Sequence, residues 1–395
     1  MFGWFVWIEL LVGLYFLYVA TYTFVFSLAG KFYRAPKGSS DGNKRKFAVL
    51  IPAYKEDGVI VDVAQKALAQ SYPADRYRVV IIADQLQRVT VEKLRALPID
   101  VLEPTFDKST KVKSLNFALQ SIPNDFDNVV ILDADNVMAP DFLEKMNAVH
   151  NSGQKVIQGE RKPKNTNNTL SYLDGLSEAI NNHIYRQGHT ALGLSASISG
   201  SGISLDYKMF YDIMSGMTSV GGFDREMELL FIQRGVKVIY NNPAFVLDEK
   251  VQKTGVFENQ RKRWISSQYH YLAKYFWKGC GALLRGNITF FNSAVLRNIQ
   301  LPRLVNFGLI VLLTIGMFFL RDYLYFGYWI WPAMLGMIIA GMALAIPAEY
   351  YSRNFLIALL KIPGLFLRMF LLMFRLKGVN KQFIHTPHGL SEESK

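Results

Sequence analysis

The sequence predicts an α/β protein, with a mainly parallel sheet flanked by helices and joined to transmembrane and interface helices. Three observations support this prediction. Short apolar runs alternate with helical patterns through the middle of the chain, which is typical of βαβ units. Acidic residues directly follow three of these runs, where the carboxyl ends of parallel strands would meet. Long apolar stretches lie near both ends of the chain.

The composition indicates a membrane-attached enzyme. Half of the 395 residues are hydrophobic (50%) and the mean hydropathy is +0.12, yet 19% of the residues are charged. The formal net charge of +12 suits either nucleic acid or anionic lipid. Because basic residues gather beside the apolar stretches, we expect membrane lipids and no nucleic acid. The single cysteine, Cys280, excludes an intrachain disulfide and any cysteine-based metal cluster.

Residues 2–30 form an apolar run that is long enough to cross a bilayer as one helix. No basic region precedes this run, so a removed signal peptide is not expected. Six basic residues follow it directly: Lys31, Arg34, Lys37, Lys44, Arg45 and Lys46. Positive charge marks the cytoplasmic side of a span. We therefore expect the N-terminus outside and the following domain in the cytoplasm, at the inner or plasma membrane.

The next predicted elements are strands that end in acidic residues. The first strand starts at residue 47, and the residues at its carboxyl end are Pro52, Ala53, Tyr54, Glu56 and Asp57. A helix over about 59–70 precedes a second strand, which ends in Asp84. A helix over 111–120 and a strand over 129–132 follow.

Asp133-Ala134-Asp135-Asn136 follows the strand over 129–132 and is the stretch around which the chain is organised. Four consecutive apolar residues predict a strand buried on both faces. Two carboxylates held together repel each other unless a cation lies between them. Magnesium prefers one or two protein carboxylates plus substrate phosphates. The stretch therefore predicts a metal site for a phosphorylated substrate, and a solvated turn is the alternative that the triplet alone leaves open.

A second group of motifs follows between residues 156 and 264. A strand over 156–161 and a helix over 171–187 come first. A run of small residues follows, which would let a ligand approach the backbone or would form a turn: Ser199, Gly200, Ser201 and Gly202. Gln260-Arg261-Lys262-Arg263-Trp264 then places Gln260 and Arg263 on one face of a helix. A basic helix with Trp264 at a membrane interface is the alternative for this last motif.

The order of these motifs resembles the inverting nucleotide-sugar glycosyltransferases of family 2, in the membrane-bound branch of the cellulose, chitin-oligosaccharide and hyaluronan synthases. The resemblance covers about residues 47–265. It implies a GT-A fold, which is a Rossmann-like mixed and mainly parallel sheet. The motif Gln-x-x-Arg-Trp, present here in full, is the most specific part of the resemblance.

The resemblance also implies roles for individual residues. In the family, the strand-end acids hold the nucleoside, and a lysine ahead of a Leu-Asn pair contacts the diphosphate; in this chain we assign that lysine to Lys113. The Asp-x-Asp aspartates bind the diphosphate and Mg²⁺ or Mn²⁺. The family places the acceptor and the leaving diphosphate at the positions that correspond to Ser199, Gly200, Ser201, Gly202, Gln260, Arg263 and Trp264. An ordinary exposed helix lysine is the alternative for Lys113.

The general base is the point at which this chain departs from the family pattern. Relatives carry an adjacent acidic pair at the start of a helix, whereas this chain has Asp224, Glu226 and Glu228 with no adjacent pair. Inverting transfer needs such a base to take the proton of the acceptor hydroxyl. We predict Glu226 as the base, with Glu228 second and Asp224 as a further candidate. Acids favoured by the helix dipole are the alternative for at least two of the three.

The C-terminal part predicts further membrane helices. Residues 266–302 have the aromatic and basic pattern of an interface helix, and 304–320 and 323–347 would form two spans around a short outer turn. The stretch over 354–374 contains Lys361 and Arg368, each costly at a bilayer centre by about 2.5–3.5 kcal/mol. We therefore expect a helix lying in the interface, kinked at Pro363, with a third span as the alternative.

We expect seven segments in this order: a transmembrane helix (1–30), a basic linker (31–46), a GT-A domain (47–265), interface helices (266–302), two transmembrane helices (303–347), an interface or third transmembrane helix (348–378) and a cytoplasmic tail (379–395). The predicted function is metal-dependent transfer of a sugar from a UDP-sugar to a polysaccharide or oligosaccharide, giving a β-linkage; a processive synthase that exports its product is one form of this function. Single-sugar transfer to a lipid, and an inactive regulatory subunit that binds nucleotide sugar, are the alternatives. Three spans are few for a channel that exports a polysaccharide. Assembly into a homo-oligomer or a synthase complex is therefore an alternative to a single chain.

Overall fold

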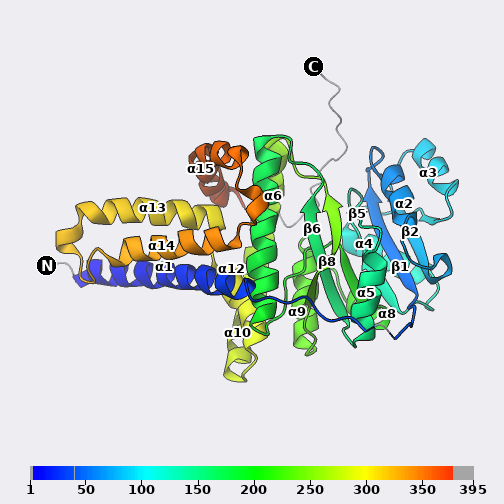
Figure 1. Ribbon diagram of the computed structural model, residues 1–395, viewed down its shortest axis with the longest axis horizontal. Coiled ribbons are helices and arrows are strands. Elements are labelled where there is room, and N and C mark those ends of the chain that lie inside the picture. The colour runs from blue at the N-terminus through cyan, green and yellow to red at the C-terminus, as the bar shows by residue number, and fades with distance from the viewer. Residues whose placement is uncertain (1–2, 40, 377–395) are drawn as a thin grey trace, which may run out of the picture.

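The computed structural model describes residues 3–39 and 41–376, and it has the predicted α/β fold. The predicted cytoplasmic tail, including His385 and His388, lies outside these residues. Eight strands form one sheet in the order β3-β2-β1-β4-β7-β6-β8-β5 (Figure 1). Their bounds are β1 Phe47–Tyr54, β2 Tyr77–Asp84, β3 Asp100–Leu102, β4 Asn128–Ile131, β5 Val137–Met138, β6 Val156–Pro163, β7 Ile203–Asp206 and β8 Ile239–Asp248.

The sheet is mixed and mostly parallel. Strands β3, β2, β1 and β4 are parallel neighbours, and β6 and β8 are also parallel. β7 lies antiparallel between β4 and β6, and β5 pairs antiparallel with β8. Strand β8 ends at Asp248, so the run of charged residues 248–250 begins inside the strand.

Helices cover both faces of the sheet, because alternate residues of each strand point to opposite sides. On one face, Ala48 and Leu50 of β1 join a core with α4, α8 and α9; on the other, Val49 and Ile51 join a core with α2 and α5. The helices of this domain are α2 Ile60–Leu68, α3 Arg88–Arg95, α4 Lys111–Ser121, α5 Phe142–Asn151, α6 Thr169–Asn181, α7 His189–Ala191, α8 Tyr207–Met214 and α9 Phe223–Gln233. A π-helical segment, Asn182–Gly188, joins α6 to α7.

The remaining helices form a second layer beside the domain. They are α1 Gly3–Gly30, α10 Thr254–Leu284, α11 Ile288–Phe291, α12 Arg297–Ile299, α13 Arg303–Phe319, α14 Ile330–Ala345 and α15 Arg353–Leu372. α10 runs without a break across residues 265 and 266, where the sequence suggested a domain boundary. Within the described residues, two helices are long and apolar enough to cross a membrane, Trp4–Gly30 and Arg353–Arg375. There are three candidates if the bent pair Ile288–Ile299 and Arg303–Phe319 forms one span.

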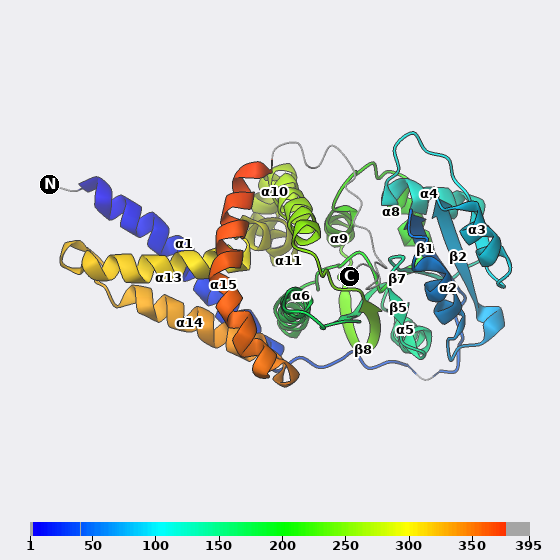
Figure 2. The same ribbon diagram turned by 90° about the horizontal axis from the view of Figure 1, so that it is seen from above.

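Helices α1, α13 and α14 lie side by side and point away from the sheet (Figures 1 and 2). The turn between α13 and α14 lies at the same end as the N-terminus (Figure 1). Glu9, the only acid in α1, is buried there, and its carboxylate accepts the backbone N–H groups of Tyr325 (2.9 Å) and Phe326 (3.2 Å). Glu9 therefore has a structural role, since it joins α1 to this turn. α15 runs across these three helices (Figure 2) and contains Pro363 within one continuous helix.

Candidate active site

The carboxyl ends of β1 and β2 form the first wall of the candidate site. Tyr54 ends β1 opposite Asp84 at the end of β2, in parallel register. The next residue of each strand, Lys55 and Gln85, has a positive φ (55° and 56°), which side chains of L-residues disfavour. Lys55 donates its backbone N–H to the Asp84 carbonyl (3.1 Å), so the two chain exits stay adjacent.

The other residues expected at this wall lie in β1 or directly after it. Pro52 is half-buried and Ala53 is buried, and both pair with β2. Glu56 is buried in the loop that follows. The carboxylate of Asp57 accepts the backbone N–H of Gln87 (2.8 Å), so it joins the loop after β1 to the loop after β2.

Asp84 has a buried carboxylate at the end of a strand. Burial raises its pKa above the ordinary value, while the Ser109 hydroxyl and the Lys55 ammonium oppose that shift. A carboxylate in this position is ready to accept hydrogen bonds from a ligand that enters the edge of the sheet.

Asp133 and Asp135 leave the sheet at the end of β4, beside the first wall. The Asp133 backbone N–H donates to the Ser201 hydroxyl (2.9 Å), which in turn donates to the Asn136 side chain (2.6 Å). The Asp135 carboxylate is buried and accepts the backbone N–H of Glu249 (3.2 Å). The two aspartates are therefore fixed from both sides.

Lys111, the first residue of α4, faces this Asp-x-Asp pair. Its ammonium group forms an ion pair with Asp133, donates to the Gly200 carbonyl (2.8 Å) and lies 5.0 Å from the ring centre of Phe223. This one side chain therefore joins the end of β4, segment 199–202 and the start of α9.

Lys113, the lysine predicted from the sequence, points elsewhere. Thr110 caps α4 by accepting the Lys113 backbone N–H (3.2 Å), which fixes where the helix begins. The Lys113 ammonium group is exposed and donates to the Lys108 carbonyl (2.9 Å). The structure thus brings Lys111, and not Lys113, to the aspartates.

Segment 199–202 lies between β4 and the end of β6. Gly200 and Gly202 have positive φ values of 78° and 62°, and a Cβ at Gly202 would lie 2.9 Å from Val246. A larger residue would therefore not fit at Gly202. The Gln158 amide accepts one backbone N–H of the segment (3.0 Å) and donates to two of its carbonyls (2.9 and 3.2 Å).

Of the three acids near the start of α9, Asp224 is the one that lies at the Asp-x-Asp side. A Cβ placed on Gly200 would be 3.5 Å from the Cβ of Asp224. Asp224 also interacts electrostatically with Arg263, as Asp133 does. Asp224 is half-buried, so its carboxylate can meet both a ligand and water.

Glu226 and Glu228 are both buried and engaged by other helices. Glu226 forms an ion pair with Lys274 of α10 and accepts a hydroxyl hydrogen bond from Tyr271 (3.3 Å). Glu228 forms an ion pair with Arg297 (2.9 Å) and accepts the backbone N–H of Ile198 (3.0 Å). Both side chains therefore connect α9 to its neighbours.

Arg263 on α10 lies close enough to two acids of the candidate site to interact with them electrostatically. Burial lowers its pKa, and the charges of Asp133 and Asp224 oppose that shift. Its guanidinium group thus lies within electrostatic reach of Asp133 and of Asp224. Gln260 lies one helical turn before it and is half-buried.

Trp264 lies next to another arginine of the same motif, Arg261. The Arg261 guanidinium lies 4.6 Å from the centre of a Trp264 ring and forms an ion pair with Asp174 of α6. Trp264 remains 37% exposed. The indole is therefore partly exposed, with a cation over one ring.

The carboxylates present fit a metal that carries phosphate oxygens. Asp133 and Asp135 supply two carboxylates from one strand exit. Within residues 3–39 and 41–376, no group of three or more His, Cys, Asp or Glu side chains is arranged to hold a metal. Mg²⁺ bound by one or two protein carboxylates completes its shell with water and substrate phosphates. The donor set thus suits a metal–diphosphate and not a closed protein site.

Three further charged residues near the site were not singled out from the sequence. The carboxylate of Asp248 is buried, pairs with Arg161 and also lies 2.9 Å from the Lys250 ammonium. Arg161 in turn interacts electrostatically with Asp133 and Asp135. The sequence has opposite charges at 248 and 250, but no sequence pattern links them to Arg161.

These features define a class of protein: a transferase with a GT-A fold, in which a mixed, mostly parallel sheet presents strand-end acids and an Asp-x-Asp pair at one edge. The chain belongs to glycosyltransferase family 2, because the family model described as "glycosyltransferase like family 2" matches residues 44–267. It is therefore a glycosyltransferase of the type that uses nucleotide sugars.

Among the solved structures that resemble this chain, one with a TM-score above 0.5 shares its fold. The mannosyltransferase PcManGT from Pyrobaculum calidifontis, in complex with GDP-mannose and Mn²⁺, has a TM-score of 0.57 and 15% identity, with 92% of this chain and 96% of that chain covered. Glucosyl-3-phosphoglycerate synthase from Mycobacterium tuberculosis (14% identity, 56% and 76% covered) and TarS from S. aureus (15% identity, 55% and 38% covered) have TM-scores of 0.39. A search of curated proteins found no match. The likeness to PcManGT concerns the fold and includes the helices beside the domain.

Proposed function

We propose that this protein is a membrane-bound inverting glycosyltransferase that transfers a sugar from a nucleoside-diphosphate sugar to an acceptor at the membrane. The observation that carries the proposal is the meeting of Lys111, Asp133, Gly200, Asp224 and Arg263 at one edge of the sheet. A carboxylate pair, two cations and a further acid are the groups that transfer from a diphosphate leaving group requires.

In the proposed binding mode, the donor lies across the ends of β1, β2 and β4. Glu56, Asp57 and Asp84 hold the nucleoside. Asp133 and Asp135 hold Mg²⁺ or Mn²⁺, which would neutralise the diphosphate charge. The PcManGT structure contains Mn²⁺ with GDP-mannose, and the glucosyl-3-phosphoglycerate synthase structure contains Mn²⁺ with uridine diphosphate. The donor nucleotide is proposed as UDP, the prediction from the sequence, with GDP as the second candidate.

Lys111 has a defined task in this proposal. Without a donor its ammonium group neutralises Asp133. When a diphosphate binds, the same ammonium group turns to the phosphate oxygens and works together with Arg263. Both cations stabilise the charge that develops on the leaving diphosphate. Lys111 replaces Lys113, the sequence-based candidate, because Lys113 points away from the aspartates.

Asp224 is the proposed general base. Its carboxylate lies beside Gly200 and opposite Arg263, where an acceptor hydroxyl can meet the donor. It takes the proton as the hydroxyl oxygen attacks the anomeric carbon and the diphosphate leaves with the electrons of the broken bond. Glu226, the base predicted from the sequence, is held by Lys274 and Tyr271 instead.

The proposed location is a membrane, with the glycosyltransferase domain on the cytoplasmic side. α1, α13 and α14 would span the bilayer, because they lie side by side and the basic residues between 31 and 46 follow α1 at the domain end. α15 would lie in the cytoplasmic interface, since it runs across these helices and its exposed face carries Leu356, Leu360 and Leu367. Trp277 on α10 (80% exposed) would anchor the same interface.

The proposal is tested by donor turnover in the full chain. Purified protein in lipid nanodiscs receives Mn²⁺ and, in turn, a series of UDP-sugars and GDP-mannose, together with membrane lipid extract as a source of acceptor. We expect release of one nucleoside diphosphate, a product with inverted anomeric configuration, and loss of both after chelation by EDTA. An Asp135→Asn variant is the inactive control. Tight nucleotide binding without turnover of any donor would support the regulatory-subunit alternative and overturn the proposal.

A further inference from the structure

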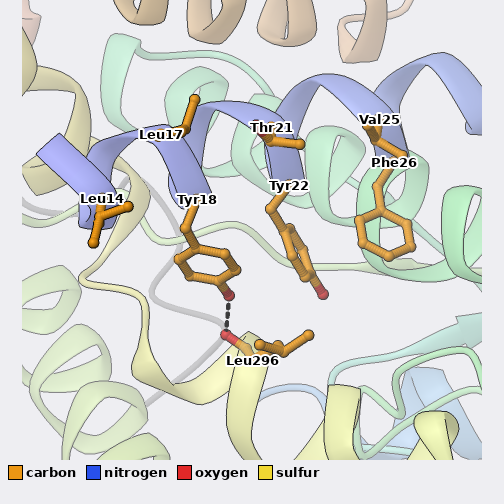
Figure 3. Close-up of a pocket in the computed structure, with 8 residues that line it drawn as sticks. All are labelled: Leu14, Leu17, Tyr18, Thr21, Tyr22, Val25, Phe26 and Leu296. Carbon is orange, nitrogen blue, oxygen red and sulfur yellow. Dashed lines mark hydrogen bonds between the residues drawn. The ribbon is translucent and has the colours of Figure 1, made fainter.

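A group of buried charges lies close to the Asp-x-Asp pair. Asp248 ends β8 and is 2% exposed, and Lys250, two residues later, is 4% exposed. Arg161 of β6 pairs with Asp248 and interacts electrostatically with Asp133 and Asp135. Among the described residues, in contrast, no charged side chain lines the pocket of about 480 Å³ along α1 (Figure 3). The buried charges at 161, 248 and 250 therefore adjoin the proposed metal site, whereas the pocket at α1 borders uncharged side chains.

One hydrogen bond joins this group of charges to the Asp-x-Asp pair. The buried Asp135 carboxylate accepts the backbone N–H of Glu249 (3.2 Å). Glu249 is the residue between Asp248 and Lys250, so the position of its N–H depends on how the chain is held at both neighbours. A carboxylate has about four acceptor sites. The hydrogen bond can therefore orient Asp135 while a metal binds to the same carboxylate.

Two residues that follow β6 hold the chain on both sides of this N–H group. The parallel pairing of β6 with β8 ends at Asp248, and just beyond it the Lys164 backbone N–H donates to the Asp248 carbonyl (2.7 Å). The Asn165 side chain accepts the Lys250 backbone N–H (2.7 Å) and donates to the Lys250 carbonyl (3.1 Å). A side-chain amide offers both an acceptor and a donor, as a peptide group does. Asn165 therefore extends the pairing of the two strands with its side chain.

Ion pairs hold the same segment, 248–250. The Lys250 ammonium group lies 2.9 Å from the Asp248 carboxylate, which also pairs with Arg161. Glu178 of α6 interacts electrostatically with Arg161 and Lys250, so two cations face two acids. Removing one member of such a buried group leaves another charge without its partner and destabilises the fold. Asn165 is uncharged and only half-buried, so it can be replaced without that penalty.

We propose that Asn165 is a positioning residue for the metal. It fixes segment 248–250, and the Glu249 N–H in that segment then holds the Asp135 carboxylate in place for Mg²⁺ or Mn²⁺. Asn165 touches neither the metal nor the donor in this role. Groups that orient a metal ligand contribute about 10- to 100-fold to metal affinity. The inference rests on the proposed function, which places the metal at Asp133 and Asp135.

Equilibrium binding of Mn²⁺ to the full chain in nanodiscs tests this role, with UDP present and, in a parallel series, with GDP. The electron paramagnetic resonance signal of free Mn²⁺ gives the dissociation constant and requires no turnover. We expect Asn165→Ala to weaken Mn²⁺ binding about tenfold. Asn167→Ala is the matched control, because Asn167 belongs to the same loop but donates to the Gln252 side chain (3.5 Å). The control should stay within about twofold of the wild type, and melting temperatures establish that both variants fold.

A second pair of variants tests the N–H group itself. Glu249→Pro deletes the donor, whereas Glu249→Ala removes the same side chain and keeps the N–H. We expect the proline variant to bind Mn²⁺ about tenfold more weakly than the alanine variant. Adding Asn165→Ala to Glu249→Pro should cause no further loss beyond about twofold, because Asn165 acts through this N–H. A purely structural role of Asn165 would instead give losses that add.

Each outcome separates the positioning role from the proposed function. Equal Mn²⁺ affinity in Asn165→Ala and Asn167→Ala, or additive losses in the double variant, would overturn the inference alone. A wild-type chain that binds no Mn²⁺ with either nucleotide would overturn the inference together with the metal-dependent function. Weaker Mn²⁺ binding by the Asn165 variant, in a protein that turns over no donor, would support the positioning role and contradict the proposed function.

Discussion

The strand-borne half and the helix-borne half of the candidate site differ in how their side chains reach the same place. At the strand-borne half, Asp84, Asp133 and Asp135 lie where parallel strands end, so the exit of each strand decides their position. At the helix-borne half, the first turns of α4 and α9 supply Lys111 and Asp224. There the helical face decides which side chain enters the site.

This difference accounts for the two proposals, Lys111 and Asp224, that differ from the sequence-based assignments. Residues two apart on a helix point about 200° apart, which is nearly opposite. Lys113 is two residues from Lys111, and Glu226 is two residues from Asp224. In both pairs the residue chosen from the sequence lies on the face that meets other parts of the chain, Lys108 in one case and Lys274 in the other. An assignment from sequence that is wrong by two residues therefore matters less at a strand exit. In the first turn of a helix, the same error selects a side chain on the opposite face.

The strongest test of the comparison is Asp224→Asn against Glu226→Gln. We expect Asp224→Asn to lower kcat about 10³-fold, because loss of a general base costs on the order of 10²–10⁴ in rate. Glu226→Gln should lower it less than tenfold, since that carboxylate pairs with Lys274. Nucleoside diphosphate release at saturating donor measures both. If the Glu226 variant folds and loses as much activity as the Asp224 variant, the assignment of the Asp224 face of α9 to the site is wrong.

Glu228→Gln should act on stability more than on chemistry. It leaves the buried Arg297 without its counter-charge, and breaking such a pair by removing one partner costs about 3–5 kcal/mol. The free energy of unfolding of the single variant should therefore fall by about that amount. The double variant Glu228→Gln with Arg297→Gln should recover part of the loss, because no unpaired charge remains. Denaturant unfolding of the protein in nanodiscs provides the measurement, and additive losses in the double variant would contradict a coupled pair.

Lys111→Gln should weaken the donor interaction, whereas Lys113→Gln should not. A hydrogen bond to a charged group contributes about 1.5–3 kcal/mol, so we expect a roughly 10- to 100-fold loss in kcat/KM for the donor in the Lys111 variant. The Lys113 variant should stay within about twofold, since its ammonium group contacts the Lys108 carbonyl. The same effect in both variants would mean that donor binding depends on the total positive charge near α4. It would not depend on the face of α4 from which the lysine projects.

Much of the fold could be predicted because its signals are local. The strands β1, β2 and β4 follow from short apolar runs, and the mixed, mostly parallel sheet follows from their alternation with helices. The pairing of β7 between β4 and β6, and the extension of β8 to Asp248, depend on contacts between distant segments and had no local signal. The same holds for Arg161, which reaches Asp248 across 87 residues. The boundary near residue 265 was placed by composition, yet α10 continues through it because its apolar face keeps packing against α9 and α11.

The smallest predicted effect concerns Asp84, where a strand exit places a carboxylate in a buried position. Burial raises its pKa in the folded state, so the folded chain holds this proton to a higher pH than the unfolded chain does. Its contribution to stability is therefore full at low pH and is lost as the pH rises through the folded-state pKa. Asp84→Asn should remove that loss, so we expect the variant to melt at a higher temperature than the wild type at pH 7.5. The difference should shrink as the pH falls, and nucleotide affinity should fall in the same variant. A variant that is less stable than the wild type at pH 7.5 would show that Asp84 is needed for the strand exit itself, and the strand-borne half would then be as sensitive to its side chains as the helix-borne half.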